Sequence, residues 1–462
     1  MMKTTFTKFG RLLVVLSFVF SSTALAQDHS PLLQDIKVQQ PSPTPLVERT
    51  GSSEPTATSL AAVRNPVRTL FPALQQVEIP GDSGILVESL DGKVVVESNA
   101  DHMFNPASNV KIATAYAVLK TFGPEFRFQT NIYTDGSVDP QTSTLTGNVY
   151  VSGKDPMFAN QHAVAVASEL NRLGIRFVTG NLYVTDNFSI NYSQSPASSA
   201  QAMLNDLDMY KRSPSATKAW LDQLAYSGQA GQVQGTPSVS FTGQPFVTGV
   251  PNNLRLLFTH ESTPMKEIIK ATLCYSNNFL AAKLGDLLGG PFAVARLVQL
   301  NANVPPGEFS LATSSGLGYN RVTPNAMMKL LRALRADLGR YDMTFMDIMP
   351  VAGIDQGTLE ERFSADWARG SIVGKTGTLG NTDGGASALA GEANTRNGRL
   401  LFVIFNMHGS VGRFRNFQNN FMPMVQAQFG GAAPMTYNAM SVESRLARSR
   451  ITYPSSVARQ GN

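Results

Sequence analysis

One predicted helix, over residues 106–122, is apolar on every side. Asn105 is a good N-cap, Pro106 suits the first helical position, and Gly123-Pro124 ends the helix. Its apolar residues form a stripe and continue around the other faces: Ile112, Ala115, Leu119 and Phe122, then Ala113, Ala117 and Val118. A helix this apolar is usually buried at the centre of a domain. The rest of the chain must therefore cover it from all sides.

Strands and helices are predicted on both sides of this helix. Asp91-Gly92 lies between two β-rich runs, 85–88 and 93–96, and indicates a hairpin. Further strands are predicted near 126–128, 147–151, 180–184, 371–379, 387–393 and 400–407, and further helices near 162–173, 220, 264–288, 324–338 and 416–429. This order indicates one domain, residues 81–130 and 251–430, interrupted by an inserted domain, residues 131–250.

Composition narrows the classes of function. With 462 residues, 42% of them hydrophobic and 15% charged, the chain can bury a sizeable core. Its net charge is +5, of which Lys3, Lys8 and Arg11 supply three, so the remaining +2 gives no support for nucleic-acid binding. The single cysteine, Cys274, excludes an intramolecular disulfide and is expected to be a buried small hydrophobe. The five histidines are scattered along the sequence and offer few candidate ligands for a catalytic metal. We therefore expect no cofactor, no metal and no nucleic-acid partner.

Both ends of the chain are predicted to lie outside the folded part. Residues 1–26 combine basic residues, an apolar run at 12–20 and the small-residue site Ala24-Leu25-Ala26, which is typical of a cleaved signal peptide. The run is far shorter than the roughly 20 residues that span a membrane. Residues 27–80 hold eight prolines and predict a linker, and residues 431–462 predict a polar, solvated tail. We expect an exported protein of the periplasm or cell-envelope space, with peripheral envelope association and oligomeric state left open.

Ser108 and Lys111 lie three residues apart at the start of the apolar helix, so both side chains fall on one face. A serine becomes a nucleophile when a base takes its proton. A lysine is such a base only if burial or a nearby positive charge lowers its pKa, and the apolar helix and its N-terminal dipole favour both. The S-x-x-K pattern alone is weak, because it also fits the start of a surface helix.

Two later motifs add to this pair. Ser276 and Asn278 form S-x-N inside the predicted helix 264–288, where an ideal helix would point them to nearly opposite sides. If both serve one site, the helix must break there into a turn; taken alone, the motif is better explained as a polar patch. Lys375-Thr376-Gly377 lies in a predicted strand. Two lysines near one serine oppose each other's charge, so one is expected to be neutral near pH 7.

The ordered set S-x-x-K, S-x-N and K-T-G resembles that of penicillin-binding proteins and class A β-lactamases. The 168 residues from Ser108 to Ser276 resemble the long first gap of the class C low-molecular-mass penicillin-binding proteins, the D-alanyl-D-alanine carboxypeptidase/endopeptidase family. Four more segments are similar to stretches of that family: Phe104-Asn105-Pro106-Ala107-Ser108, Gly153-Lys154-Asp155-Pro156, Ser314-Ser315-Gly316-Leu317 and Pro350-Val351-Ala352-Gly353-Ile354-Asp355-Gln356-Gly357-Thr358-Leu359. The resemblance covers residues 81–429.

The resemblance implies an α/β fold, in which an antiparallel sheet of the penicillin-binding/serine β-lactamase type is flanked by helices and interrupted by a β-rich insert. It also implies cleavage of D-Ala-containing peptidoglycan stem peptides or crosslinks through an acyl-enzyme, with β-lactams as inhibitors. The resemblance implies that Ser108 is the nucleophile, that Lys111 is its base, and that Ser276, held by Lys111 and Lys375, relays a proton. It implies that Asn278 contacts the substrate amide and that Lys375 and Thr376 contact the substrate carboxylate. It also implies that Gly377 leaves space for the substrate and that the N–H groups of Ser108 and Thr378 form the oxyanion hole.

Three departures from the family pattern leave finer points open. S-N-N replaces S-D-N, Lys154 replaces a glycine, and the first gap is short for a full two-domain insert. The role of the insert and the balance between carboxypeptidase and endopeptidase action therefore stay open. A serine β-lactamase or esterase on the same scaffold is one alternative, against which the bulky insert argues. An inactive cell-wall-binding scaffold is another, against which the intact serines and lysines argue.

Overall fold

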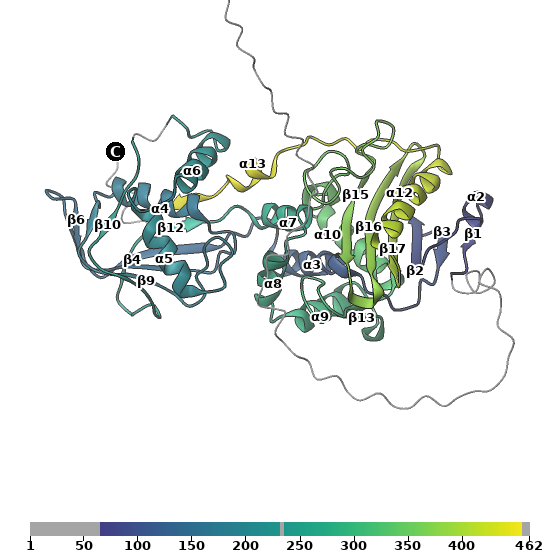
Figure 1. Cartoon of the computed structure of the whole chain (residues 1–462), viewed down its shortest axis with the longest axis horizontal. Coiled ribbons are helices and arrows are strands. Elements are labelled where there is room, and N and C mark those ends of the chain that lie inside the picture. Colours follow the sequence, from purple (N-terminus) through teal and green to yellow (C-terminus); the bar gives the residue numbers. More distant parts are fainter. Residues whose placement is uncertain (1–64, 232–234, 455–462) are drawn as a thin grey trace, which may run out of the picture. The chain divides into compact units, whose positions relative to one another are not determined.

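The computed structural model describes residues 65–231 and 235–454 (Figure 1). The expected signal peptide, residues 1–26, and most of the expected linker lie outside the described residues. Within the described part, no helix combines the length and the apolar character needed to cross a membrane.

The main sheet is antiparallel and has six strands. Their order is β1 (Arg68–Thr69), β3 (Val94–Ser98), β2 (Asp82–Ser89), β17 (Gly398–Met407), β16 (Ala386–Thr395) and β15 (Ile372–Leu379), so β15 forms one edge. The predicted hairpin is confirmed as β2 and β3. Short elements lie between the longer helices and strands of this domain: η3 (Pro306–Glu308), β13 (Phe309–Ser310), β14 (Arg321–Val322), α11 (Phe345–Ile348) and η4 (Thr382–Gly384).

Helices cover both faces of this sheet (Figure 1). Alternate strand residues point to opposite faces, so Leu401 and Val403 of β17 join one core, and Leu400 and Phe402 join another. Helices α3 (Val110–Phe122) and α10 (Pro324–Gly339) pack on the first, and α2 (Pro72–Gln75) and α12 (Val411–Ala427) pack on the second. The expected antiparallel sheet flanked by helices is confirmed.

Helix α3 is buried along most of its length, as its apolar sequence predicts. Every residue from Val110 to Leu119 is buried, and Gly123 ends the helix. It begins after a short 3₁₀ turn, η2 (Ala107–Asn109). Three further helices contact it: α7 (Met265–Cys274), α8 (Asn278–Asp286) and α9 (Pro291–Asn301). This 3₁₀ turn and the first turn of α3 therefore hold Ser108 and Lys111 against the interior.

The helical pattern over 264–288 breaks, as the S-x-N motif requires. Helix α7 ends at Cys274, and α8 begins at Asn278. In the turn between them, Ser276 has a left-handed φ of 54°. Asn277 caps α8, because its Oδ1 accepts the N–H of Leu280 at 3.0 Å. The turn therefore gives Ser276 and Asn278 directions that a continuous helix would not.

The inserted region has two sheets and a core of its own. The larger sheet has the order β11 (Pro245–Val247), β9 (Leu182–Val184), β7 (Val149–Gly153), β4 (Gln129–Thr134), β12 (Arg255–Glu261) and β18 (Arg450–Thr452). The smaller has the order β10 (Ser240–Phe241), β8 (Phe177–Val178), β6 (Thr144–Thr146) and β5 (Ser137–Asp139). Helices α4 (Asn160–Arg172), α5 (Pro196–Leu207) and α6 (Pro214–Tyr226) complete the region. The boundary expected at residue 250 is too early, because β12 belongs to this sheet.

One predicted strand does not form, and one helix of the insert was left unassigned from the sequence. Residues 126–128 form no strand; Phe126 and Phe128 instead pack ring against ring, with centroids 5.2 Å apart. Helix α5 was not predicted, because residues 187–250 are rich in Ser, Gln, Gly and Pro. Its start nevertheless carries helix-initiating residues: the Ser195 hydroxyl accepts the N–H of Ser198, and Pro196 takes the first position.

The folded part extends beyond both expected boundaries. Residues 65–80, assigned to the linker, contain β1 and α2, and Leu74 is fully buried there. Pro72 begins α2, so a residue that predicted a linker instead starts a helix. Residues 431–454, assigned to the solvated tail, contain α13 (Val442–Leu446) and β18, which pairs with β12. Arg445 is buried because the carboxylate of Glu267, rather than water, is its partner.

Candidate active site

The amine of Lys111 is buried where three segments meet. Nζ lies 3.0 Å from Oγ of Ser108 and 2.7 Å from Oδ1 of Asn278. It also donates to the carbonyl oxygen of Ser315 at 2.6 Å. Burial, and then the charge of Lys375, lowers the pKa of Lys111 well below its usual value. A neutral amine in this position can accept the proton of the Ser108 hydroxyl.

Lys375 provides the second buried amine. Its Nζ lies 2.9 Å from Oγ of Ser276 and donates to the carbonyl oxygen of Thr376 at 2.6 Å. Burial lowers the pKa of Lys375 to about 7. Because its charge acts on Lys111, protonation of one amine opposes protonation of the other. The structure thus gathers the predicted residues into two linked groups: Ser108, Lys111 and Asn278, and Ser276 and Lys375.

Strand β15 lies directly against residues 106–108, the turn that carries the predicted nucleophile Ser108 (the nucleophile turn). A Cβ on Gly377 would lie 2.7 Å from the carbonyl oxygen of Pro106 and 3.0 Å from Cβ of Ala107, so a larger residue would push the two apart. Thr376 and Thr378 share the opposite face of the strand, because successive side chains alternate. Thr376 is buried and Thr378 is exposed. The predicted substrate-binding residues therefore line the edge of the sheet beside Ser108.

The nucleophile turn holds an alanine in the left-handed region. The φ of Ala107 is 46°, a conformation that costs a non-glycine residue about 1–3 kcal/mol. Two contacts hold it. Oδ1 of Asn105 accepts its N–H at 3.0 Å, and the backbone at Gly316 approaches so closely that a Cβ there would lie 2.0 Å from its carbonyl oxygen. The loop that contains Gly316 also brings the carbonyl oxygen of Ser315 to the amine of Lys111.

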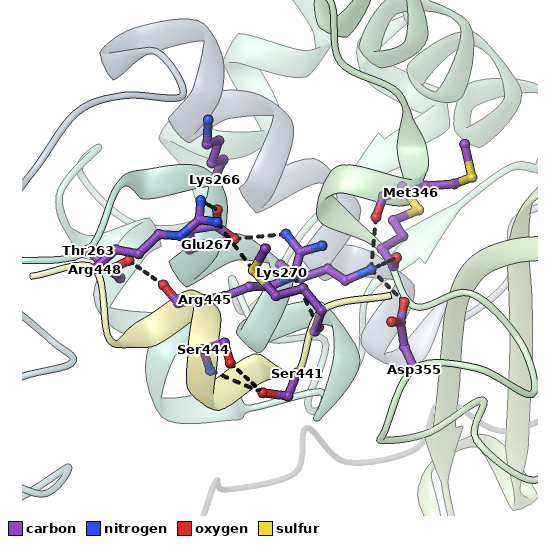
Figure 2. Close-up of polar contacts among 12 residues, drawn as sticks. Thr263, Lys266, Glu267, Lys270, Met346, Asp355, Ser441, Ser444, Arg445 and Arg448 are labelled. Carbon is purple, nitrogen blue, oxygen red and sulfur yellow. Dashed lines mark hydrogen bonds and ion pairs between the residues drawn. The ribbon is translucent and has the colours of Figure 1, made fainter. Parts of the chain in front are cut away.

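Helix α7 carries one partner of a buried ion pair (Figure 2). Nζ of Lys270, on α7, donates to Oδ2 of Asp355 at 2.6 Å. It also donates to the carbonyl oxygens of Met346 at 2.8 Å and Met349 at 2.6 Å. The same carboxylate oxygen accepts the N–H of Val351 at 2.8 Å. Family resemblance pointed to the segment of Asp355, but no local pattern in the sequence indicated its lysine partner.

The loop that contains this aspartate forms hydrogen bonds with both α7 and β15. The N–H of Thr358 donates to the carbonyl oxygen of Cys274 at 2.9 Å, two residues before Ser276. At the other end, the carbonyl oxygen of Pro350 accepts the N–H of Gly374 at 3.2 Å, directly before the lysine of K-T-G. The buried ion pair therefore anchors a loop that connects the two elements holding the second amine and its serine.

Four other residues considered in the sequence analysis are buried: Cys274, Asp155, His162 and His260. Cys274 is buried, as expected of a cysteine that packs as a small hydrophobic residue, and burial raises the pKa of its thiol to about 11. Asp155 is buried, and burial raises its pKa to about 7. His162 and His260 both pack against the ring of Phe158.

A sequence profile of the D-Ala-D-Ala carboxypeptidase 3 (S13) family matches residues 68–235 and 237–426. The chain belongs to this family. The match spans the main domain and the insert alike, so the S13 assignment does not depend on the three motifs alone.

Relatives and solved structures agree with the S13 assignment. The chain is 23% identical over 420 residues to a D-alanyl-D-alanine carboxypeptidase of Actinomadura sp. (strain R39), covering 70% of this chain and 77% of that protein. It is 21% identical over 436 residues to the D-alanyl-D-alanine carboxypeptidase DacB of Haemophilus influenzae, covering 74% and 88%. A predatory peptidoglycan endopeptidase of Bdellovibrio bacteriovorus has a similar fold, with a TM-score of 0.65 at 21% identity over 77% of this chain and 95% of that one. For penicillin-binding protein 4 of Haemophilus influenzae, the TM-score is 0.56 at 19% identity over 77% and 98%.

S13 membership confirms three expectations drawn from the sequence: the resemblance, the fold class and the enzyme class, a serine-type D-Ala-D-Ala carboxypeptidase. The S-N-N motif and Lys154 are therefore variations within an S13 chain.

Proposed function

We propose that this S13 enzyme cleaves the D-Ala-D-Ala bond of peptidoglycan stem peptides, the D-Ala crosslink, or both, through an acyl-enzyme on Ser108. One observation carries the proposal: the buried amine of Lys111 lies 3.0 Å from the serine hydroxyl. Its surroundings also lower its pKa. A neutral amine can take a hydroxyl proton, whereas an exposed lysine is protonated near neutral pH.

Acylation begins when Oγ of Ser108 attacks the carbonyl carbon before the scissile bond and its proton passes to Lys111. Ser276, held by the amine of Lys375 at 2.9 Å, delivers a proton to the leaving nitrogen as the C–N bond breaks, and the proton held by Lys111 then restores the hydroxyl of Ser276. Water then hydrolyses the ester, releases the peptide and restores the serine hydroxyl. The proton taken from the nucleophile is thus balanced by the proton given to the amine.

The edge of β15 offers a place for the substrate as an added strand. The N–H groups of Ser108 and Thr378 are assigned to the oxyanion hole, a feature worth about 10²–10³ in rate per donor. Asn278 is assigned to the substrate amide. The terminal carboxylate and the path of the substrate chain are assigned to Lys375, Thr376 and Gly377.

Export completes the proposal. The pattern of residues 1–26 favours cleavage after Ala26 and places the mature enzyme in the periplasm or cell-envelope space, where peptidoglycan peptides are its partners. β-Lactams are expected to acylate the nucleophile. A solved structure of the Bdellovibrio endopeptidase is described as penicillin G acylated, and it is 22% identical to this chain with a TM-score of 0.66.

A fluorescent penicillin tests the proposal. The mature protein should take a stable covalent label, and Ser108→Ala should take none. Thr121→Ala, a change of a hydroxyl residue at the far end of α3, is the matched control and should be labelled like the wild type. Rapid release of hydrolysed penicillin would indicate a β-lactamase instead. Failure of the folded wild type to take any label would indicate an inactive scaffold.

A further inference from the structure

One carboxylate links the nucleophile turn to the loop that follows β15. Asp383, in η4, accepts from both terminal nitrogens of the Arg321 guanidinium, at 2.7 Å through Oδ1 and at 3.0 Å through Oδ2. Its Oδ2 also accepts from Nδ2 of Asn105 at 2.7 Å. The side chain of Asp383 is only 8% exposed. Three charge-assisted hydrogen bonds therefore hold a carboxylate to which the reaction scheme assigns no part.

This carboxylate fixes the direction in which the amide of Asn105 faces. An ionised carboxylate only accepts hydrogen bonds, so the NH₂ group of the amide must turn toward Asp383. The same Nδ2 donates to the carbonyl oxygen of Gly318 at 2.9 Å. Oδ1 is thereby left to accept the N–H of Ala107 at 3.0 Å, the contact that holds this residue in the left-handed region. The orientation of one side-chain amide therefore links Asp383 to the strained backbone before Ser108.

Both N–H groups assigned to the oxyanion hole lie on segments that this network joins. The peptide group between Ala107 and Ser108 carries the first donor, so the conformation of Ala107 sets the direction of that N–H. Thr378, near the end of β15, carries the second, and η4 follows that strand. The hydrogen bond between Asn105 and Asp383 thus ties the segment of one donor to the segment of the other. Oxyanion stabilisation requires both donors to converge on the point where the charge develops.

We infer that Asp383 is a positioning residue for the oxyanion hole: through Asn105, it sets the direction and spacing of the two donors. Arg321 holds the carboxylate in place, because a bidentate guanidinium pair fixes its geometry as well as its charge. This inference rests on the proposed acyl-enzyme function and deepens it. The left-handed φ of Ala107 agrees with it, since strained backbone at functional sites persists only where surrounding contacts hold it.

Infrared spectroscopy of the penicillin acyl-enzyme tests the inference in the full mature protein. The oxyanion-hole donors polarise the ester carbonyl on Ser108 and lower its stretching frequency, and penicillin with ¹³C at that carbon isolates the band. Asp383→Asn should raise the frequency above that of the wild type and slow acylation about tenfold. The reason is that an amide in place of the carboxylate donates as well as accepts, so it no longer requires the NH₂ group of Asn105 to face it.

Two further variants provide a milder change and a control. Arg321→Gln keeps the carboxylate but removes its bidentate partner, so it should move the band in the same direction by a smaller amount. Glu78→Gln breaks the exposed ion pair between Glu78 and Arg413, and it should change neither the band nor the acylation rate. If Asp383→Asn does not fold, the band of Arg321→Gln decides the outcome.

The band separates positioning from stability, because partial unfolding lowers the labelled fraction without altering the ester that forms. An unchanged band in both Asp383→Asn and Arg321→Gln would overturn the positioning role and leave the peptidase function intact. A folded wild type that takes no penicillin label would overturn the proposed function, and the positioning role with it.

Discussion

Asp355→Asn should strongly destabilise the catalytic domain. The side chains of Lys270 and Asp355 are only 1% and 5% exposed, with 2.6 Å between nitrogen and oxygen. The asparagine would leave the lysine charge buried with only neutral oxygens as acceptors. Breaking one side of a buried ion pair costs about 3–5 kcal/mol. Lys270→Met should cost less, because Asp355 keeps the N–H of Val351 and the hydroxyl of Tyr437 as donors.

The double variant Lys270→Met/Asp355→Leu removes both charges and should be more stable than the sum of the single losses predicts. We expect a coupling energy of at least about 2 kcal/mol. Urea denaturation measures it through tryptophan fluorescence. The chain has two tryptophans, and Trp220 lies in the insert. A Trp220→Phe background therefore leaves Trp367 as the reporter of the catalytic domain.

Additive losses, with a coupling energy below about 0.5 kcal/mol, would refute the reasoning. The same variants also carry a functional readout. Because the loop of Asp355 bonds to the backbone beside the Ser276 turn, the single variants should be acylated more slowly by fluorescent penicillin under conditions where they remain folded. The double variant should recover part of that rate.

Three further predictions concern the reacting groups. The acylation rate should rise with pH as Lys111 loses its proton, because burial and the charge of Lys375 lower the pKa of Lys111 well below its usual value, burial lowers the pKa of Lys375 to about 7, and only the neutral base accepts a proton; a flat profile from pH 5 to 8 would contradict this. Lys111→Arg should reduce acylation by about 10²-fold or more, measured by stopped-flow labelling, because arginine keeps its proton; near-normal rates would remove this residue as the base. Gly377→Ala should slow acylation at least about tenfold, because the added methyl group meets the nucleophile turn. Gly380→Ala, in open space, should label like the wild type, and equal rates for the two variants would show that the close approach of β15 is unimportant.

Much of the site was predictable because its chemistry imposes patterns on the sequence. The apolar run over 106–122 predicted a buried helix, since no surface arrangement could hide all its faces. The turn at Ser276 was predictable because Ser276 and Asn278 would point to nearly opposite sides of a continuous helix and could not both reach one site. Family resemblance then supplied residue roles that spacing alone left open.

What stayed hidden depends on backbone and distant partners. Nothing in the identity of Ala107 indicates a left-handed φ, because that conformation is imposed by Asn105 and the approach of Gly316. The acceptor at Ser315 is a carbonyl group, which every residue has. The arginines of the C-terminal segment looked solvated, because Glu267 lies far away in the sequence.

The pairing of β18 with β12 has a consequence for biosynthesis. The chain leaves the ribosome from its N-terminus, yet Arg450 bonds to Glu261, 189 positions earlier. The outer strand of the insert sheet, and both arginines that neutralise Glu267 on α7, are therefore translated after every reacting group. A polypeptide truncated before Arg445 would carry every reacting group but leave that carboxylate without its counterions, so complete folding of the enzyme requires the segment from Arg445 to β18.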